Sequence, residues 1–371
     1  MIYFDNAATM GKKPETVVEA VRNSLYWFSA NPGRSGHALS LKAAEKVYEA
    51  REKIARLFGC ENAENVIFTG NCTQSINTVL KGVLSKGDHV VISSQEHNAV
   101  MRPLVKLRNP YTLANISLED NQETLNSFEK AIKPHTRLVF CTAASNVTGR
   151  ILPIEKIGEM CNKRRILFGV DAAQLGGICP IDMRRMNIDF LCLAPHKGLF
   201  APMGIGVLIA RKPIDKTIIE GGTGSFSADF LQPEALPEKF ESGTLNLSGC
   251  MGVSAGIDFL NQVGMEKLYN HEIGLIKKLY FGLSKNPKVT LYTPMPKHGE
   301  YVAVLPFNLK GKTSEETAVF LDEKGVAVRG GLHCAPLAHR QIGTLKSGAV
   351  RVSLSPFNTE KEIESFLEIM S

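Results

Sequence analysis

Apolar residues recur at helical spacing from about residue 42 to residue 58. They are Ala43, Ala44, Val47, Ile54, Leu57 and Phe58. Side chains three and four positions apart share one face of a helix, and a glycine commonly follows the last helical turn. The pattern therefore predicts an amphipathic helix over residues 42–58 that ends at Gly59.

Short runs of apolar, often β-branched residues follow this helix, and a loop and a helical pattern separate each run from the next. The runs lie at residues 65–68, 89–92, 137–140, 167–170, 190–193 and 204–210. Strands that alternate with helices are typical of a parallel sheet covered on both faces. We therefore expect an α/β domain built on such a sheet.

The pattern changes in the last third of the chain. Residues 250–282 resemble one long helical region interrupted near Gly264, and a strand at 302–307 and a helix at 314–324 follow. A chain of 371 residues is long enough for two domains. We expect a large domain over residues 13–255 and a smaller α+β domain formed by residues 1–12 and 256–371.

Composition and charge exclude several classes of partner. Hydrophobic residues make up 44% and charged residues 22% of the chain, close to the averages of globular proteins. The 43 basic and 37 acidic residues are scattered, so the net charge of +6 indicates a solvated surface and no nucleic-acid partner. Since the sequence has no run of about eighteen apolar residues, we expect no membrane partner either.

Cysteine usage and the first residues bear on compartment and metal binding. The eight cysteines form no C-x-x-C pair, which argues against a zinc site, and we expect them to be mostly reduced and buried. The segment MIYFDNAATM has no basic stretch before an apolar run, so nothing marks it for secretion. We expect a cytoplasmic protein without a metal.

Polar residues follow three of the predicted strands, at the sheet edge where parallel α/β proteins bind ligands. The turn Thr69–Asn77 leads into a helix whose free N–H groups suit a phosphate, although the turn alone favours an ordinary capped helix start. Asp171 and Lys197 follow two later strands. A carboxylate that protonates a pyridine nitrogen and an amine that forms a Schiff base are what a pyridoxal cofactor requires.

Each of these residues also has a structural interpretation, Asp171 as a helix cap and Lys197 as a surface lysine. Their occurrence together, with His196 beside the lysine and Gly198 after it, favours the cofactor site.

Three motifs resemble those of the class V aminotransferase superfamily, in particular cysteine desulfurases and selenocysteine lyases. They are Asp171-Ala172-Ala173-Gln174, His196-Lys197-Gly198 and Val328-Arg329-Gly330-Gly331-Leu332-His333-Cys334-Ala335. The similarity extends from Tyr3 to Leu354, and the last motif resembles desulfurases whose cysteine lies on a short, ordered loop. It implies pyridoxal 5'-phosphate as cofactor and the type I fold of pyridoxal-phosphate transferases, with a large, mainly parallel seven-stranded sheet domain and a smaller α+β C-terminal domain.

The resemblance implies a role for each matching residue. Lys197 would hold the cofactor, His97 would stack on its ring, and Asp171 would pair with the ring nitrogen. The other expected cofactor-binding residues are Asn146 and Gln174 at the ring phenolate oxygen, and Cys72, Thr73, His196 and, from a neighbouring subunit, Thr244 at the phosphate. Because that last contact crosses an interface, the resemblance also implies a homodimer.

The substrate side of the site follows from the same resemblance. Arg351 would bind the carboxylate of an amino-acid substrate, for which a guanidinium fork is suited, and His37 and Arg329 would line the pocket. Lys197 would remove the Cα proton and Cys334, as a thiolate, would take the sulfur or selenium as a persulfide. His333 and Arg329 are candidates for lowering the thiol pKa, and His333 is equally a loop histidine without such a role.

Two positions depart from the family pattern. Ala194 stands where a serine or threonine usually binds phosphate, and Cys72 stands where a threonine is common. Two hydroxyl donors are therefore missing from the predicted phosphate site.

The leading hypothesis is an L-cysteine desulfurase, with selenocysteine as an alternative substrate and a sulfur-acceptor protein as a partner. A class V β-lyase, aminotransferase or epimerase in which Cys334 has no role remains an alternative. A scaffold without catalysis is a third interpretation, disfavoured because Lys197 and Asp171 are both present.

Overall fold

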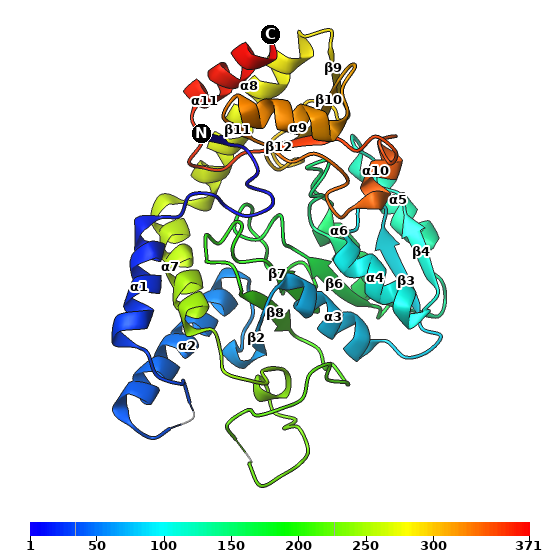
Figure 1. Ribbon diagram of the computed structural model, residues 1–371. Helices are drawn as coiled ribbons and strands as arrows, with labels where there is room; N and C mark the ends of the chain where they lie inside the picture. Colours follow the sequence, from blue (N-terminus) through cyan, green and yellow to red (C-terminus); the bar gives the residue numbers. More distant parts are fainter. Residues whose placement is uncertain (34, 226) are drawn as a thin grey trace.

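The large domain is organised around a mainly parallel, seven-stranded sheet in the order β2-β8-β7-β6-β5-β3-β4. A computed structural model describes residues 1–33, 35–225 and 227–371 (Figure 1). The strands are β2 (Val66–Thr69), β3 (His89–Ser93), β4 (Tyr111–Ala114), β5 (Thr136–Thr142), β6 (Leu167–Asp171), β7 (Phe190–Leu193) and β8 (Gly206–Ala210). Only β8 runs antiparallel to its neighbours, β2 and β7, among the described strands of this sheet. The predicted seven-stranded α/β architecture is confirmed.

Helices cover both faces of this sheet, as the alternation of strands and helices predicted. They are α1 (Glu15–Trp27), α2 (Ala38–Leu57), α3 (Cys72–Val83), α4 (Asn98–Leu107), α5 (Asn121–Ala131), α6 (Ile154–Lys163) and α7 (Leu247–Val263), with short 3-10 turns at Ala63–Asn65 and Glu238–Phe240. Successive strand residues alternate between the two faces: Val91 packs with α2, α5, α6 and α7, whereas Val90 and Ile92 pack with α3 and α4. The strands are buried on both faces, which explains their continuous apolar runs.

The C-terminal part of the chain forms a second, smaller unit with its own core. Strands β9 (Val289–Leu291), β10 (Val304–Leu309) and β12 (Val350–Ser353) make an antiparallel sheet in the order β12-β10-β9. The helices of this unit are α8 (Met265–Ser284), α9 (Ser314–Glu323), α10 (Pro336–Gln341) and α11 (Glu360–Met370). The chain's first strand, β1 (Ile2–Tyr3), pairs with β11 (Val326–Ala327), so the N-terminus lies with this unit (Figure 1).

The element boundaries refine the predictions in three places. Helix α2 starts at Ala38, earlier than predicted, because the His37 side chain caps it by accepting from the Ser40 N–H. Strand β4 was not predicted, since it is a half-exposed edge strand without an apolar run. The helical break at Gly264 is confirmed, and its φ of 93° suits glycine.

The domain boundary at residue 255 falls inside α7 and stays a prediction. In the described parts of the chain, no helix is long and apolar enough to cross a membrane.

Candidate active site

A cavity of about 130 Å³ opens beyond the carboxyl ends of β6 and β7, where the site was predicted. Eight of the predicted cofactor residues line it together: Cys72, Thr73, His97, Asn146, Asp171, Gln174, His196 and Lys197. Ala194 lines the same cavity and offers no hydroxyl there. These residues are spread over positions 72 to 197 of the chain, so the sheet edge assembles the site.

Asp171 is the last residue of β6, and its side chain is almost fully buried. Its Oδ1 accepts a hydrogen bond from the Ala173 N–H at 2.9 Å and lies 3.7 Å from the Cys72 thiol, which donates to it. Burial, and secondly the charge of Asp171, raises the pKa of the Cys72 thiol well above its usual value. Cys72 therefore stays protonated and serves as a donor to this carboxylate.

Lys197 reaches the cavity from the loop after β7. Burial lowers the pKa of its amine, with Asp171 acting in the opposite direction. No ion pair to Lys197 occurs in the described parts of the chain. A lowered pKa increases the fraction of neutral amine, which is the form that can make a covalent bond to an aldehyde.

Two histidines flank the lysine in fixed orientations. His97 is the N-cap of α4, and its Nδ1 accepts from the Ala99 N–H at 3.0 Å. His196 Nδ1 lies 3.0 Å from the Thr9 hydroxyl, and burial lowers the pKa of its ring to about 4. Burial also lowers the pKa of His97. At neutral pH both rings are uncharged, and a neutral His97 suits stacking on an aromatic ring.

The side chains and free amides of this cavity fit the three functional ends of pyridoxal phosphate. Asp171 provides a carboxylate for the pyridine nitrogen and Lys197 an amine for the aldehyde. The first-turn N–H groups of α3, at Cys72 and Thr73, have no partner within the helix and suit a phosphate. His196 adds a ring nitrogen to the same cavity. The residues present can therefore hold this cofactor, with backbone amides in place of the missing hydroxyls.

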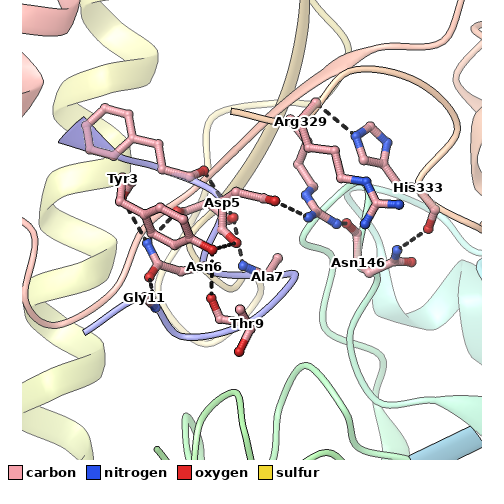
Figure 2. A network of polar contacts seen from close by, with 12 residues as sticks. Tyr3, Asp5, Asn6, Ala7, Thr9, Gly11, Asn146, Arg329 and His333 are labelled. Atoms are coloured by element: carbon pink, nitrogen blue, oxygen red, sulfur yellow. Dashed lines mark hydrogen bonds and ion pairs between the residues drawn. The ribbon is translucent and has the colours of Figure 1, made fainter. Parts of the chain in front are cut away.

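Cys334 lies outside this cavity on a tight, left-handed turn. His333 and Cys334 have φ angles of 50° and 56°, and Gly331 has a φ of 106°. The Cys334 carbonyl accepts from the Asn98 N–H at 2.7 Å. The His333 carbonyl accepts from the Asn146 side chain at 2.8 Å (Figure 2). Asn146 lines the cavity and Asn98 lies between His97 and Ala99, which also line it, so the turn is fastened to the rim while Cys334 itself stays exposed.

His333 has a structural role in this turn. Its Nε2 contacts the Arg329 carbonyl at 3.1 Å, and because a carbonyl only accepts, Nε2 carries the proton. Its Nδ1 then accepts from His339 Nε2 at 3.1 Å, and His339 Nδ1 accepts from the Thr344 hydroxyl at 2.7 Å. Burial lowers the pKa of His333 to about 3. This arrangement favours the structural interpretation of His333, and its candidate role at the thiol stays a prediction.

The two arginines expected at the substrate lie side by side in the small unit, where an isolated antiparallel bridge joins Arg329 to Arg351 of β12. Arg351 is buried on β12, and its Nη2 is 2.6 Å from Asp5 while its Nη1 donates to the Asn146 carbonyl at 3.1 Å. Arg329 is exposed and makes no ion pair with any described residue. Arg351 does not line the cofactor cavity in this structure, although Asn146 connects it to the rim.

His37 and Thr244 lie apart from the cavity of their own chain. Both are exposed, and His37 is engaged in capping α2. Segments next to them, Asn31–Gly33 on one side and Gly243 with Leu245 on the other, line a second cavity of about 270 Å³. A role for either residue at the site requires a second copy of the chain.

Sequence reasoning missed the N-terminal residues that complete this region. Asp5 pairs with Arg351, the Ala7 carbonyl accepts from Gln174 at 3.1 Å, and Lys13 donates to the His196 carbonyl at 3.0 Å. The motif Tyr3–Thr9 resembled the family, but no spacing rule relates residues that are this far apart in the chain.

Comparison with known proteins identifies the family of the chain. The family model described as aminotransferase class-V matches residues 2–366. A probable cysteine desulfurase of Synechocystis is 31% identical over 99% of this chain and 90% of its own, and one of Pyrococcus abyssi is 33% identical over 100% and 93%.

Solved structures agree with the fold. The apo cysteine desulfurase of Thermococcus onnurineus superposes with a TM-score of 0.91 at 33% identity, covering 100% of this chain and 93% of that one. The desulfurase CsdA of Escherichia coli gives 0.87 at 26% identity, covering 99% and 93%. The expected fold class, that of type I pyridoxal-phosphate enzymes, is thereby confirmed. This chain belongs to the class-V aminotransferase family.

Proposed function

We propose that the chain is a pyridoxal 5'-phosphate-dependent cysteine desulfurase that converts L-cysteine to L-alanine and carries the sulfur as a persulfide on Cys334. The observation that carries the proposal is the turn of Cys334. An exposed thiol is held at the rim of the cofactor cavity by hydrogen bonds to Asn98 and Asn146. The names of the similar proteins reported above, cysteine desulfurases or probable ones of which the chain covers 90–93%, support the same reaction.

The residues of this chain divide the work between binding, proton transfer and sulfur transfer. The bound cofactor supplies an electron-accepting ring that stabilises negative charge at the substrate Cα. Arg351, with Arg329 and the His37 of a second subunit, would hold the substrate carboxylate. Lys197, whose amine pKa burial lowers, would take the Cα proton and return it.

Sulfur transfer requires the Cys334 thiolate to reach the substrate sulfur. A sulfur–sulfur bond forms as the carbon–sulfur bond breaks, and the bonding pair stays with the carbon fragment. That fragment takes up protons and leaves as alanine, so the thiol of Cys334 becomes a persulfide without any external oxidant. The exposure of Cys334 suits the next step, delivery of the sulfur to an acceptor protein. Selenium in L-selenocysteine could be attacked in the same way.

A homodimer and a cytoplasmic location complete the proposal. Several apolar side chains are exposed at the end of α1 and at the start of α2 next to His37 in the sequence, namely Leu25, Tyr26, Trp27, Leu39 and Leu41. Exposed apolar side chains of this size are typical of a subunit interface, and a partner there could bring His37 and Thr244 to the other site. All eight cysteines are free thiols, which suits a reducing compartment.

The test is product analysis of the purified, cofactor-loaded protein given L-cysteine and a reductant. Wild type should release alanine and sulfide in equal amounts, and the Cys334→Ala variant should release neither while keeping the visible absorption band of the bound cofactor. Turnover that survives in Cys334→Ala would assign the chain to a β-lyase, aminotransferase or epimerase reaction. A protein that develops no band with added cofactor would contradict the cofactor assignment itself.

A further inference from the structure

Asp5 belongs to a segment that we call the N-terminal strap, residues 3–13, which crosses between the two units of the molecule (Figure 2). The strap is fastened to β12 by its backbone and by Asn6. The Ala7 N–H donates to the Ser353 hydroxyl at 2.8 Å, and the Asn6 side chain donates to the Ser353 carbonyl at 3.0 Å. These bonds hold the strap independently of the Asp5 side chain.

The ion pair between Asp5 and Arg351 is only half of what a guanidinium can make. Nε and Nη2 form one edge of the guanidinium, and a carboxylate that fits this edge accepts from both nitrogens. Asp5 Oδ1 contacts Nη2 at 2.6 Å, whereas Nε is buried and has no hydrogen-bond partner. The edge is therefore engaged by one bond where two are available.

Accessibility places Asp5 in the path of an incoming anion. The side chain of Asp5 is 20% exposed and that of Arg351 only 2%. The carboxylate of Asp5 is thus the more accessible member of the pair and covers the buried cation. This arrangement explains why Arg351 does not line the cofactor cavity, although Asn146 accepts from its Nη1 and does line it.

We propose that Asp5 is a placeholder carboxylate that holds the Arg351 guanidinium until the substrate carboxylate takes over its Nε–Nη2 edge. Before substrate arrives, Asp5 compensates a buried charge that would destabilise the fold if it had no partner. On binding, the Asp5 side chain rotates toward solvent while Asn6 and Ala7 keep the strap in place. Asp5 is a positioning residue, and the inference rests on the proposed function because it assumes an amino-acid carboxylate at Arg351.

The placeholder makes substrate binding a competition between two carboxylates for one cation. The competition lowers the affinity for any carboxylate. In return, the buried Arg351 guanidinium keeps an ion-pair partner when no substrate is bound. Removing the charge of Asp5 should therefore strengthen carboxylate binding and weaken the unliganded fold. If Asp5 only oriented Arg351, its replacement would instead weaken carboxylate binding, because the guanidinium would be misplaced.

The test measures propionate binding by the full-length, cofactor-loaded protein, using calorimetry and the thermal midpoint. Propionate carries the carboxylate without the amine or sulfur, and propylamine serves as the probe without a carboxylate. Asp5→Asn should bind propionate about tenfold more tightly than wild type and show a larger propionate-induced rise in midpoint, with no change toward propylamine. Asp5→Glu, which restores a carboxylate, should return to wild-type binding.

The matched control is Glu300→Gln. Glu300 pairs at 2.8 Å with Arg150, which is also buried, and neither residue is hydrogen-bonded to the Arg351 side chain, whose partners are Asn146 and Asp5. The control should lower the thermal midpoint as Asp5→Asn does and leave propionate binding unchanged. Equal or weaker propionate binding by Asp5→Asn would overturn the proposal.

Wild type provides a test that does not depend on any variant folding. A crystal structure with propionate should show its carboxylate on Nε and Nη2 of Arg351 and Asp5 turned away. Propionate bound with Asp5 still on Nη2, or absent from Arg351, would overturn the proposal. Neither outcome bears on whether L-cysteine yields alanine, so a failure of the proposed function is recognised separately, by product analysis.

Discussion

The two reactive groups of this molecule lie in opposite surroundings. Lys197 sits in a cavity formed by the sheet edge of the large domain, with neutral histidines around it and a pKa lowered by burial. Cys334 lies on an exposed turn of the small unit, where the surrounding hydrogen bonds go to its backbone. The cavity favours chemistry that must be protected from water, and the turn favours a group that must meet another protein.

The difference shows how one fold separates proton transfer from sulfur delivery. Burial and the surrounding side chains set the pKa of Lys197, whereas backbone geometry sets the position of Cys334. The remaining seven cysteines illustrate the contrast, because each is buried or half-buried. Burial raises the pKa of the Cys192 and Cys141 thiols well above the usual value, which makes them poor nucleophiles.

The largest loss of activity is expected from replacing Lys197 in the cavity. Lys197→Ala should lower alanine production by at least about 10³-fold, since a positioned proton carrier contributes about 10²–10⁴-fold and the covalent attachment is lost as well. Absorption spectra should show only loosely bound cofactor. Lys163→Ala, at an exposed helical position, should retain full activity. Activity of Lys197→Ala near that of Lys163→Ala would exclude the assigned role.

Replacing Cys334 should separate reactivity from stability. Cys334→Ser should lower sulfur transfer by about 100-fold or more, yet change the free energy of unfolding by no more than about 0.5 kcal/mol, because the side chain is exposed. Cys250→Ser is the matched opposite: a buried hydroxyl without a partner should cost about 1–3 kcal/mol and leave turnover per folded molecule intact. Urea unfolding and sulfide release measure both quantities, and a reversed pattern would contradict the comparison.

Lowering the pH should destabilise the folded protein through protonation of His333. The folded pKa of about 3 lies below the unfolded value of 6.5, so the unfolded chain binds the proton more readily. Stability is therefore complete above about pH 6.5 and is lost as the pH falls toward 3, by at most about 1.4 kcal/mol per pH unit for this residue. His333→Gln should flatten the dependence of the urea midpoint on pH between about 6.5 and 4.5. An unchanged slope would mean that His333 is already protonated in the folded protein.

Restoring a hydroxyl at Ala194 should produce the smallest effect, on the phosphate side of the cavity. Ala194→Ser should tighten cofactor binding about threefold to tenfold, the value of one additional hydrogen bond. Ala210→Ser is the control, since Ala210 ends the neighbouring strand β8 at the opposite edge of the sheet. Fluorescence titration with pyridoxal phosphate measures both variants. Equal affinities would indicate that the phosphate lies elsewhere.

The sequence predicted the parts of this structure that depend on local pattern. Six of the seven strands of the large sheet, the break at Gly264 and the position of Asp171 and Lys197 at strand ends all followed from apolar runs and their spacing. Strand β4 was not predicted, because an edge strand needs no apolar run. The pairing of Asp5 with Arg351 joins residues 346 positions apart, and no local pattern encodes such a contact.

The role of His333 shows another limit of sequence reasoning. A histidine next to a reactive cysteine could be charged or neutral, and the answer depends on His339 and Thr344, which fold around it. The burial of this one side chain favours the neutral ring, and the sequence pattern does not show the burial of a single loop residue.

The most direct test of the central claim is mass analysis of the Cys334 peptide after the cofactor-loaded protein has reacted with L-cysteine and an alkylating agent, without reductant. The account predicts that this peptide gains one additional sulfur atom, in an amount equal to the alanine released, while the peptides of the other cysteines do not. Alanine released without sulfur on Cys334, or sulfur found first on another cysteine, would contradict the account.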